Sequence, residues 1–190
     1  MMKLTLSLAL VTVSACASSD TTKTPDADVP RVLATATAKM EGRSGTDVSG
    51  TVTFTERRAS VGGEMMNVID VRYDITGITP GDTRGFHVHE VGDCSAPDAT
   101  SAGGHFNPGK HEHGAMDHPS SHAGDLGNIT ANPAGRAEGV ITGVTKFTLE
   151  PGPNSIVGRG LIVHEKADDY TTQPTGNAGP RLACAVIQKD

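Results

Sequence analysis

Tryptophan is absent from the 190-residue sequence, and all aromatic residues together make up only 3% of it. A hydrophobic core therefore has to rest on Val, Ile, Leu and Ala. A surplus of basic residues is absent as well, because 16 Lys and Arg stand against 22 Asp and Glu, which gives a formal net charge of −6. General nucleic-acid binders carry a basic face, so this balance predicts no nucleic-acid partner. It does not exclude a small anionic substrate, because a protein with a negative net charge can still have a positive local field at its binding site.

The sequence also lacks an apolar run long enough to span a bilayer. The run over 4–13 is too short for a transmembrane helix, but behind Lys3 it has the form of an export signal. It ends in Val13-Ser14-Ala15-Cys16, which resembles the lipobox of bacterial lipoproteins, where the signal is cleaved before the Cys and the Cys is acylated. We predict a signal peptide at 1–15, a lipid on Cys16 and membrane attachment through that lipid only.

This start of the chain predicts a place in the cell envelope. We expect a lipoprotein that faces the periplasm from a membrane, by preference the outer membrane; the alternative is a soluble periplasmic or secreted protein cleaved near Ala15 or Ala17. Residues 16–30 are small and polar and indicate a flexible tether, so the folded domain is expected over 31–190. Either route leads to an oxidising compartment, in which two remaining cysteines usually pair.

Apolar and polar residues alternate with a period of two in much of the domain. The stretches 51–55 and 69–75 show this most clearly, and no stretch has a sustained helical period. Turn signals rich in Gly, Pro and Asn separate such stretches, which predicts an all-β sandwich or barrel. Two segments, 91–125 and 165–182, are long enough to be functional loops. Further strands are predicted around 33–40, 85–90, 138–149, 156–164 and 183–188.

The histidines are unevenly distributed. Seven of the eight lie between His87 and His122, and the eighth is His164. Residues i and i+2 of a strand share a face, so His87 and His89 point the same way, and paired imidazoles on a strand suit Cu or Zn. The plainer interpretation of this pair is two solvent-facing histidines.

The following loop carries more potential ligands. Three His and one Asp, as found between His105 and Asp125, can build a closed tetrahedral zinc site. A solvated His-rich loop that binds metal loosely is the alternative. His164 has apolar neighbours at the end of a predicted strand, where a lone His is more often structural than a ligand.

Five segments in order resemble copper–zinc superoxide dismutase in its bacterial lipoprotein form. They are GFHVHE (85–90), GGHFNP (103–108), HAGDLGN (122–128), GRGLIVHEKADD (158–169) and TGNAGPRLAC (175–184). The resemblance covers nearly all of 31–190 and implies an eight-stranded Greek-key β-barrel of the immunoglobulin-like sandwich type, with two long functional loops. It implies an oxidoreductase that dismutes superoxide to dioxygen and hydrogen peroxide with a copper cofactor, carries a structural zinc, and protects the cell envelope.

The resemblance also assigns ligands residue by residue. The implied copper ligands are His87, His89, His105 and His164. The implied zinc ligands are His105, His113, His122 and Asp125. His105 would serve both metals as a bridging imidazolate, which is reasonable because an imidazole loses its second proton only between two strong cations.

Further roles follow from the same resemblance. Arg181 matches the arginine beside copper, where a fixed guanidinium positions an anion. Arg181 and His105 are therefore the predicted catalytic residues. Asp168 matches a carboxylate that links the outer nitrogens of His87 and His113 and so fixes their orientation.

The resemblance implies an intramolecular disulfide between Cys94 and Cys184. The segment Ile156–Arg159 is similar to a dimer contact of eukaryotic members, which favours a homodimer over a monomer. His111 and His113 both lie near the expected zinc position; the alignment favours His113, and His111 and His118 are left without a role.

Two rival functions follow from other classes of protein. A copper carrier or zinc store would need neither Arg181 nor a four-ligand copper set. A non-enzymatic relative that keeps the barrel as an interaction module should have lost a copper ligand, and none is missing from this sequence.

Overall fold

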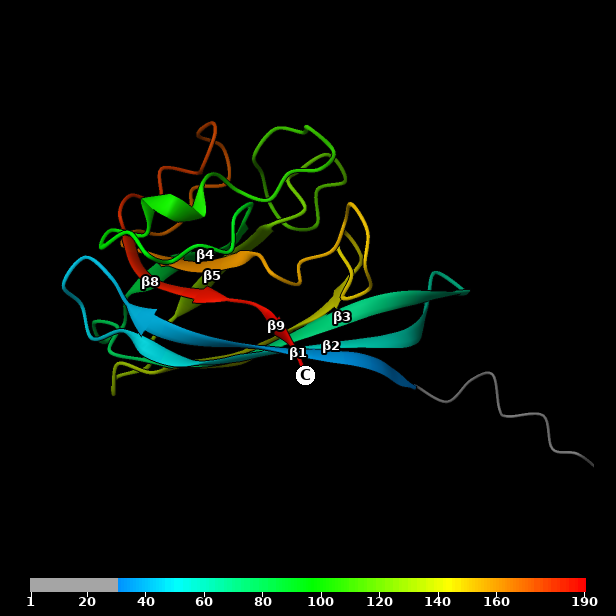
Figure 1. Ribbon diagram of the computed structural model, residues 1–190, viewed down its shortest axis with the longest axis horizontal. Helices are drawn as coiled ribbons and strands as arrows, with labels where there is room; N and C mark the ends of the chain where they lie inside the picture. The colour runs from blue at the N-terminus through cyan, green and yellow to red at the C-terminus, as the bar shows by residue number, and fades with distance from the viewer. Residues whose placement is uncertain (1–30) are drawn as a thin grey trace, which may run out of the picture.

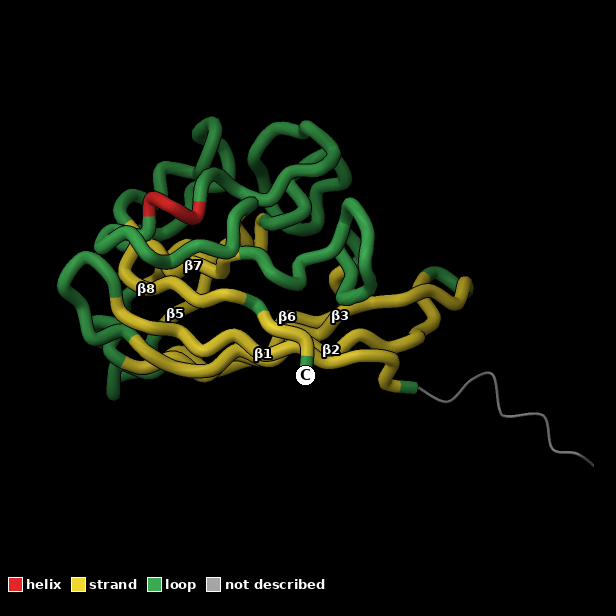
Figure 2. The backbone as a smooth tube through the Cα atoms, viewed as in Figure 1, coloured by secondary structure: helices red, strands yellow, loops and turns green. Residues whose placement is uncertain are grey.

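The structure is a computed structural model that describes residues 31–190. The predicted signal peptide (1–15), Cys16 and the tether (16–30) lie outside the described residues. Strands and loops make up nearly all of the described chain (Figures 1 and 2). The elements are β1 (Val32–Gly42), β2 (Ser49–Val61), β3 (Glu64–Thr76), β4 (Thr83–His89), the 3-10 turn η1 (Thr100–Ala102), β5 (Asp125–Thr130), β6 (Ala137–Val144), β7 (Gly160–His164), β8 (Arg181–Val186) and β9 (Gln188–Lys189).

The strands form a nearly closed antiparallel barrel. Their order is β5-β4-β7-β8-β1-β2-β3-β6, and the short β9 pairs with β1 beside this path. The chain crosses between the two halves of the barrel after β3, after β5 and after β6, and the two halves form the two layers seen in Figure 1. The predicted all-β, eight-stranded barrel is confirmed, and β9 is a small addition to it.

The core lies between these layers and follows the predicted alternation. On β2, Val52 and Phe54 are buried, while the alternating residues Thr51, Thr53 and Thr55 are exposed or half-buried. On β3, Val71 faces the same core and lies opposite Phe54 in the β2–β3 register. Aromatic packing adds little, as expected from the composition; the Phe54 and Phe147 rings meet edge to face with centroids 6.4 Å apart.

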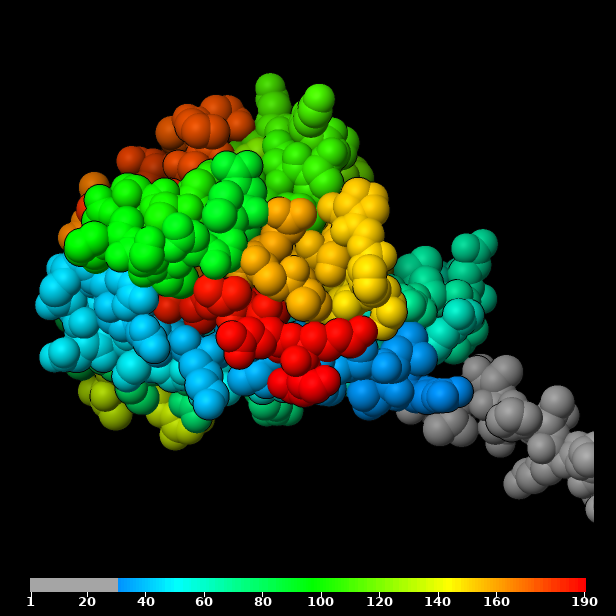
Figure 3. Space-filling model, viewed as in Figure 1, coloured from blue at the N-terminus to red at the C-terminus, as the bar shows by residue number. Residues whose placement is uncertain are grey.

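Strands β4 and β7 differ from this pattern because they are buried on both faces. Phe86 and Val88 enter the core, and His87 and His89 point the other way, as the sequence predicts, yet these histidines are buried too. The segments 90–124 and 165–180 cover that outer face. Figure 3 shows the green residues of the first loop packed along the same edge of the molecule as the orange residues of the second. Both predicted long loops are therefore present and enclose the histidines.

A third long connection was not predicted. Strand β6 ends at Val144 and β7 begins only at Gly160, so the strands predicted over 138–149 and 156–164 are too long. The intervening segment is held by Glu56, a carboxylate that is 1% exposed. It accepts hydrogen bonds from Thr148 Oγ1 at 2.9 Å and from the Leu149 N–H at 2.8 Å. The bond from the Leu149 N–H gives the main chain a partner in place of strand pairing, and the bond from the Thr148 hydroxyl holds the segment beside it.

The disulfide pairs Cys94 in the first loop with Cys184 on β8, with Cα atoms 5.8 Å apart. It ties the loop that carries most of the histidines to the barrel wall. Within residues 31–190, no helix is long and apolar enough to cross a membrane.

Candidate metal centre

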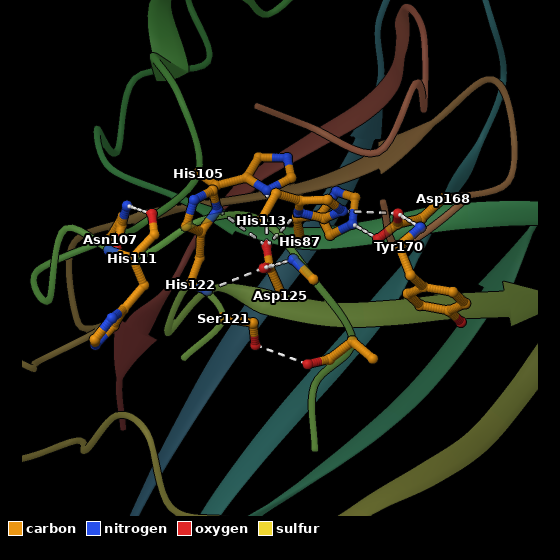
Figure 4. Close-up of polar contacts among 12 residues, drawn as sticks. His87, His105, Asn107, His111, His113, Ser121, His122, Asp125, Asp168 and Tyr170 are labelled. Carbon is orange, nitrogen blue, oxygen red and sulfur yellow. Dashed lines mark hydrogen bonds and ion pairs between the residues drawn. The ribbon is translucent and has the colours of Figure 1, made fainter. Parts of the chain in front are cut away.

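Two groups of buried ligand-type side chains meet beneath the long loops (Figure 4). Within each group, one nitrogen or oxygen atom per residue lies within 4.8 Å of those of the other members. The first group is His87, His89, His105 and His164, and the second is His105, His113, His122 and Asp125.

Three members of the first group lie on two neighbouring strands, and the fourth, His105, lies in the first loop. His87 and His89 lie on β4, and His164 ends the adjacent β7. Gly160 lies opposite His89 in the register. A Cβ atom at this glycine would lie 2.7 Å from the Val91 carbonyl oxygen and 3.5 Å from the His89 Cβ. The glycine of the GRGLIVH segment thus lets β7 approach the Val91 main chain, two residues after His89.

Hydrogen bonds on the far side of each ring decide which nitrogen is free. His89 Nδ1 donates to the Gly103 carbonyl at 2.9 Å, and His164 Nδ1 donates to the Gly179 carbonyl at 3.1 Å. Each Nε2 in these neutral tautomers therefore carries a lone pair, yet the two Nε2 atoms face each other at 3.3 Å. Two lone pairs in that arrangement repel unless a cation lies between them.

The second group gathers around Asp125, the first residue of β5. Its Oδ1 lies 2.8 Å from His105 Nδ1, 3.1 Å from His113 Nδ1 and 3.3 Å from His122 Nδ1. Its Oδ2 accepts the main-chain N–H groups of Gly114 and His122, both at 3.1 Å. Burial would raise the pKa of Asp125, but the three histidines outweigh it and hold that pKa far below its usual value. The carboxylate is thus fixed as an anion.

Asp168 links the two groups from behind. Its Oδ2 accepts from His87 Nε2 and its Oδ1 from His113 Nε2, both at 2.8 Å. Gly176 packs directly against this carboxylate, because a Cβ atom there would lie 1.9 Å from Asp168 Oδ1. Asn128 holds the Asp168 main chain, accepting its N–H at 2.8 Å and donating to its carbonyl at 2.9 Å. Asp168 therefore fixes both ring orientations and is itself held in place.

Four buried ring nitrogens have no hydrogen-bond partner within the described residues: His87 Nδ1, His105 Nε2, His113 Nδ1 and His122 Nδ1. Such atoms are rare in folded proteins, and each belongs to one of the two groups. Four imidazole nitrogens suit copper, and three imidazoles with one carboxylate suit a closed zinc site. The donor sets therefore fit both metals, and His105 belongs to both sets through its two nitrogens.

Burial favours the neutral rings that metal binding needs. It lowers the pKa of His105 to about 4 and that of His164 to about 3, and it moves the pKa of His89 in the same direction. His113 differs, since burial lowers its pKa but Asp125 and Asp168 raise it to about 9. A metal cation at His113 Nδ1 would take the place of that proton.

Arg181 begins β8 and lies opposite His164 in the β7–β8 register. Its guanidinium donates to the carbonyls that flank η1, those of Ala99 and Gly103. The Gly103 carbonyl oxygen, 2.6 Å from Arg181 Nη2, is the same atom that accepts from His89 Nδ1. A single peptide group thus places the cation next to the first histidine group.

Two histidines stay outside both groups. His111 and His118 are exposed, and Figure 4 shows His111 turned away from Asp125. The structure brings together all of the predicted ligands, Asp168 and Arg181; their individual roles remain predictions. Sequence reasoning missed Asn128 and Gly176, although both lie inside the segments quoted for the resemblance.

Comparison with known proteins gives one consistent result. A family model described as copper/zinc superoxide dismutase matches residues 48–187. The copper–zinc superoxide dismutase of Yarrowia lipolytica is 45% identical over 152 residues, which cover 76% of this chain and 92% of that protein. That of Candida glabrata is 42% identical over 158 residues, covering 80% and 96%. A crystal structure titled as that of the clock protein EA4 superposes with a TM-score of 0.69 at 36% identity, covering 83% of this chain and 96% of the other.

The length of these matches and the two histidine groups agree. The chain belongs to the copper/zinc superoxide dismutase family, a family of oxidoreductase enzymes.

Proposed function

We propose that this chain dismutes superoxide at a paired copper–zinc centre, with His87, His89, His105 and His164 as copper ligands and His105, His113, His122 and Asp125 as zinc ligands. The observation that carries the proposal is His105, whose Nδ1 lies 2.8 Å from Asp125 while its Nε2 belongs to the four-histidine group without a hydrogen-bond partner. One ring thus joins the two sites. Copper would supply one-electron redox cycling, which oxidises one superoxide to dioxygen and, with two protons, reduces the next to hydrogen peroxide.

The residues of the chain then bind the anion and handle protons. Arg181 uses two guanidinium N–H groups on main-chain carbonyls, and the others remain for a small anion beside His89 and His164. His105 Nε2 is the atom at which a proton can be held for transfer to the product, because the other ring nitrogen, Nδ1, faces Asp125 in the second group, where zinc would hold it. Asp168 holds His87 and His113 in place throughout.

The test is removal of His164. His164→Ala should abolish superoxide dismutation and leave zinc content and fold intact, because this ring belongs only to the four-histidine group. His118→Ala, at an exposed histidine outside both groups, is the matched control and should retain activity. Full activity of a copper-loaded His164→Ala protein would overturn the copper assignment.

We also propose that the enzyme works in the cell envelope, as a lipoprotein anchored through Cys16 after cleavage of 1–15, with 16–30 as a tether, and protects that compartment from superoxide. The lipobox-like sequence supports this, and a disulfide between Cys94 and Cys184 suits an oxidising compartment. The alternative is a soluble periplasmic or secreted enzyme. Cys16→Ser should release the protein from the membrane fraction or block its processing, and an unmodified Cys16 on a soluble wild-type protein would refute the anchor.

A homodimer is proposed for the assembled enzyme. Its support is the similarity of Ile156–Arg159 to a dimer contact of eukaryotic members. Light scattering on the purified chain should give twice the monomer mass; a monomer mass at micromolar concentration would contradict the dimer.

A further inference from the structure

Two side-chain amides hold the segment His111–Glu112–His113 by its main chain. Asn107 accepts the His111 N–H and donates to the His111 carbonyl, both at 2.9 Å. Gln173 accepts the His113 N–H at 2.8 Å and donates to the His113 carbonyl at 2.9 Å. Each amide thus makes the pair of bonds with which an antiparallel strand would hold one residue.

The two amides come from different parts of the chain. Asn107 belongs to the same loop as His111, four positions away. Gln173 lies in the loop before β8, 60 positions from His113. Asp168 belongs to that same second loop and accepts from His113 Nε2 at 2.8 Å. The second loop therefore holds His113 at three points: the main-chain N–H, the main-chain carbonyl and the outer ring nitrogen.

The two histidines end in different environments. His113 is buried, with its Nδ1 facing Asp125 at 3.1 Å, whereas the His111 ring is exposed and turned away (Figure 4). Asp168 fixes the orientation of the His113 ring through Nε2, but it makes no hydrogen bond to the His113 main chain. Within the described residues, Gln173 is the only side chain bonded to the His113 N–H and carbonyl. The adjoining Gly114 N–H donates to Asp125 Oδ2 at 3.1 Å.

We propose that Gln173 is a positioning residue for the zinc ligand His113, which sets the zinc affinity by holding the main chain of that ligand in place before the metal binds. The inference rests on the proposed zinc assignment. Without the amide, the His113 N–H and carbonyl turn to water, and the bonds that remain are that of the ring to Asp168 and that of the Gly114 N–H to Asp125. Zinc binding must then also order the segment, and outer partners of ligands typically contribute roughly 10- to 100-fold in metal affinity.

The experiment compares Gln173→Met with Asn107→Leu in the purified, copper- and zinc-loaded full chain. Both changes keep much of the side-chain volume and remove both amide hydrogen bonds. Zinc affinity is measured by competition with a chromophoric chelator. We expect Gln173→Met to lower it by roughly 10- to 100-fold. We expect Asn107→Leu to change it by no more than about twofold, the effect of an ordinary surface substitution.

A second readout separates positioning from general stability. Cobalt exchanged into the zinc site reports ligand geometry through its visible absorption bands. At saturating cobalt, we expect Gln173→Met to shift or weaken these bands and Asn107→Leu to keep the wild-type spectrum. A variant that has only lost stability would show the wild-type spectrum once saturated.

The outcomes distinguish this inference from the zinc assignment on which it rests. If His113→Ala binds zinc as wild type does, the assignment itself fails. If His113→Ala loses zinc while Gln173→Met keeps wild-type affinity and cobalt spectrum, only the inference is overturned. Equal losses in Gln173→Met and Asn107→Leu would also overturn it, because they would show a general effect of loosening the segment.

Discussion

Removal of the Cys94–Cys184 disulfide tests how firmly the first loop must be held. The bond joins positions 90 residues apart. Closing a loop of that length in the unfolded chain corresponds to about 4.6 kcal/mol at 25 °C. We expect Cys94→Ala/Cys184→Ala to lose up to about this much free energy of unfolding. Alanine is the suitable replacement because Cys184 is buried among Ala99, Ala102 and Ile162, where a serine hydroxyl would lack a partner.

The same change should reach the candidate active site through Arg181. Both carbonyls that hold its guanidinium, those of Ala99 and Gly103, lie in the loop that the disulfide ties down. Hydrogen bonds from Arg43 Nε to the Cys94 carbonyl at 3.0 Å and from the Ser44 N–H to the Pro97 carbonyl at 2.8 Å remain. We therefore expect the superoxide-dismuting rate of the metal-loaded variant to fall without being lost.

The assay is urea unfolding of metal-free protein followed by far-UV circular dichroism, since bound metals would spoil two-state behaviour. Wild type, wild type under reductant and the double variant are compared. Reduced wild type and the variant should lose similar free energy. A loss below about 1 kcal/mol in both would refute the chain-entropy reasoning, and a loss only in the variant would point to packing of the removed sulfur atoms instead.

Three further predictions concern single side chains. Arg181→Ile should lower the rate of superoxide dismutation, keep both metals and make that rate less dependent on ionic strength, because the fixed cation is expected to attract the superoxide anion against a net charge of −6. Stopped-flow rates across a salt series check this, and an unchanged salt dependence would show that other groups attract the anion. Asp168→Asn should weaken zinc binding roughly 10- to 100-fold, as measured by chelator competition. His87 and His113 donate to different oxygens of the carboxylate, and in Asn an NH2 donor replaces one of these acceptors. His113→Ala should lose zinc by elemental analysis and His111→Ala should keep it, and the reverse result would show that the choice between the two histidines is wrong.

The parts of the fold that local pattern determines were predictable. Alternation on β2 and β3 reports a half-buried sheet, and the His-x-His spacing on β4 places both rings on one face whatever covers that face. The local pattern could not show that loops bury this face of β4, because the residues that cover it are distant in the sequence. The disulfide could be predicted by counting and not by geometry: lipidation of Cys16 would leave two cysteines, and the predicted export would place them in an oxidising compartment.

The errors lie where long-range polar contacts replace strand pairing. Residues 145–149 alternate like a strand, yet Thr148 and Leu149 bind the buried Glu56 carboxylate more than 90 positions away in sequence. Asn128 and Gln173 were missed for the same reason. An amide that holds the main chain of Asp168 or His113 leaves no local periodicity, so only the folded structure assigns it a role.

The Gly103 carbonyl oxygen connects Arg181 to His89, and this link could not be predicted from local sequence. The sequence can nominate Arg181 and His89 as neighbours only through a resemblance, because 92 positions in the numbering separate them. In the structure one carbonyl oxygen accepts from both, at 2.6 and 2.9 Å. A carbonyl oxygen has two lone pairs and can accept from both donors. The position of the guanidinium proposed to bind the anion and the orientation of a proposed copper ligand are thus fixed by the same peptide group. Any movement of the first loop should disturb both together, which is why the disulfide variant is expected to lose rate as well as stability.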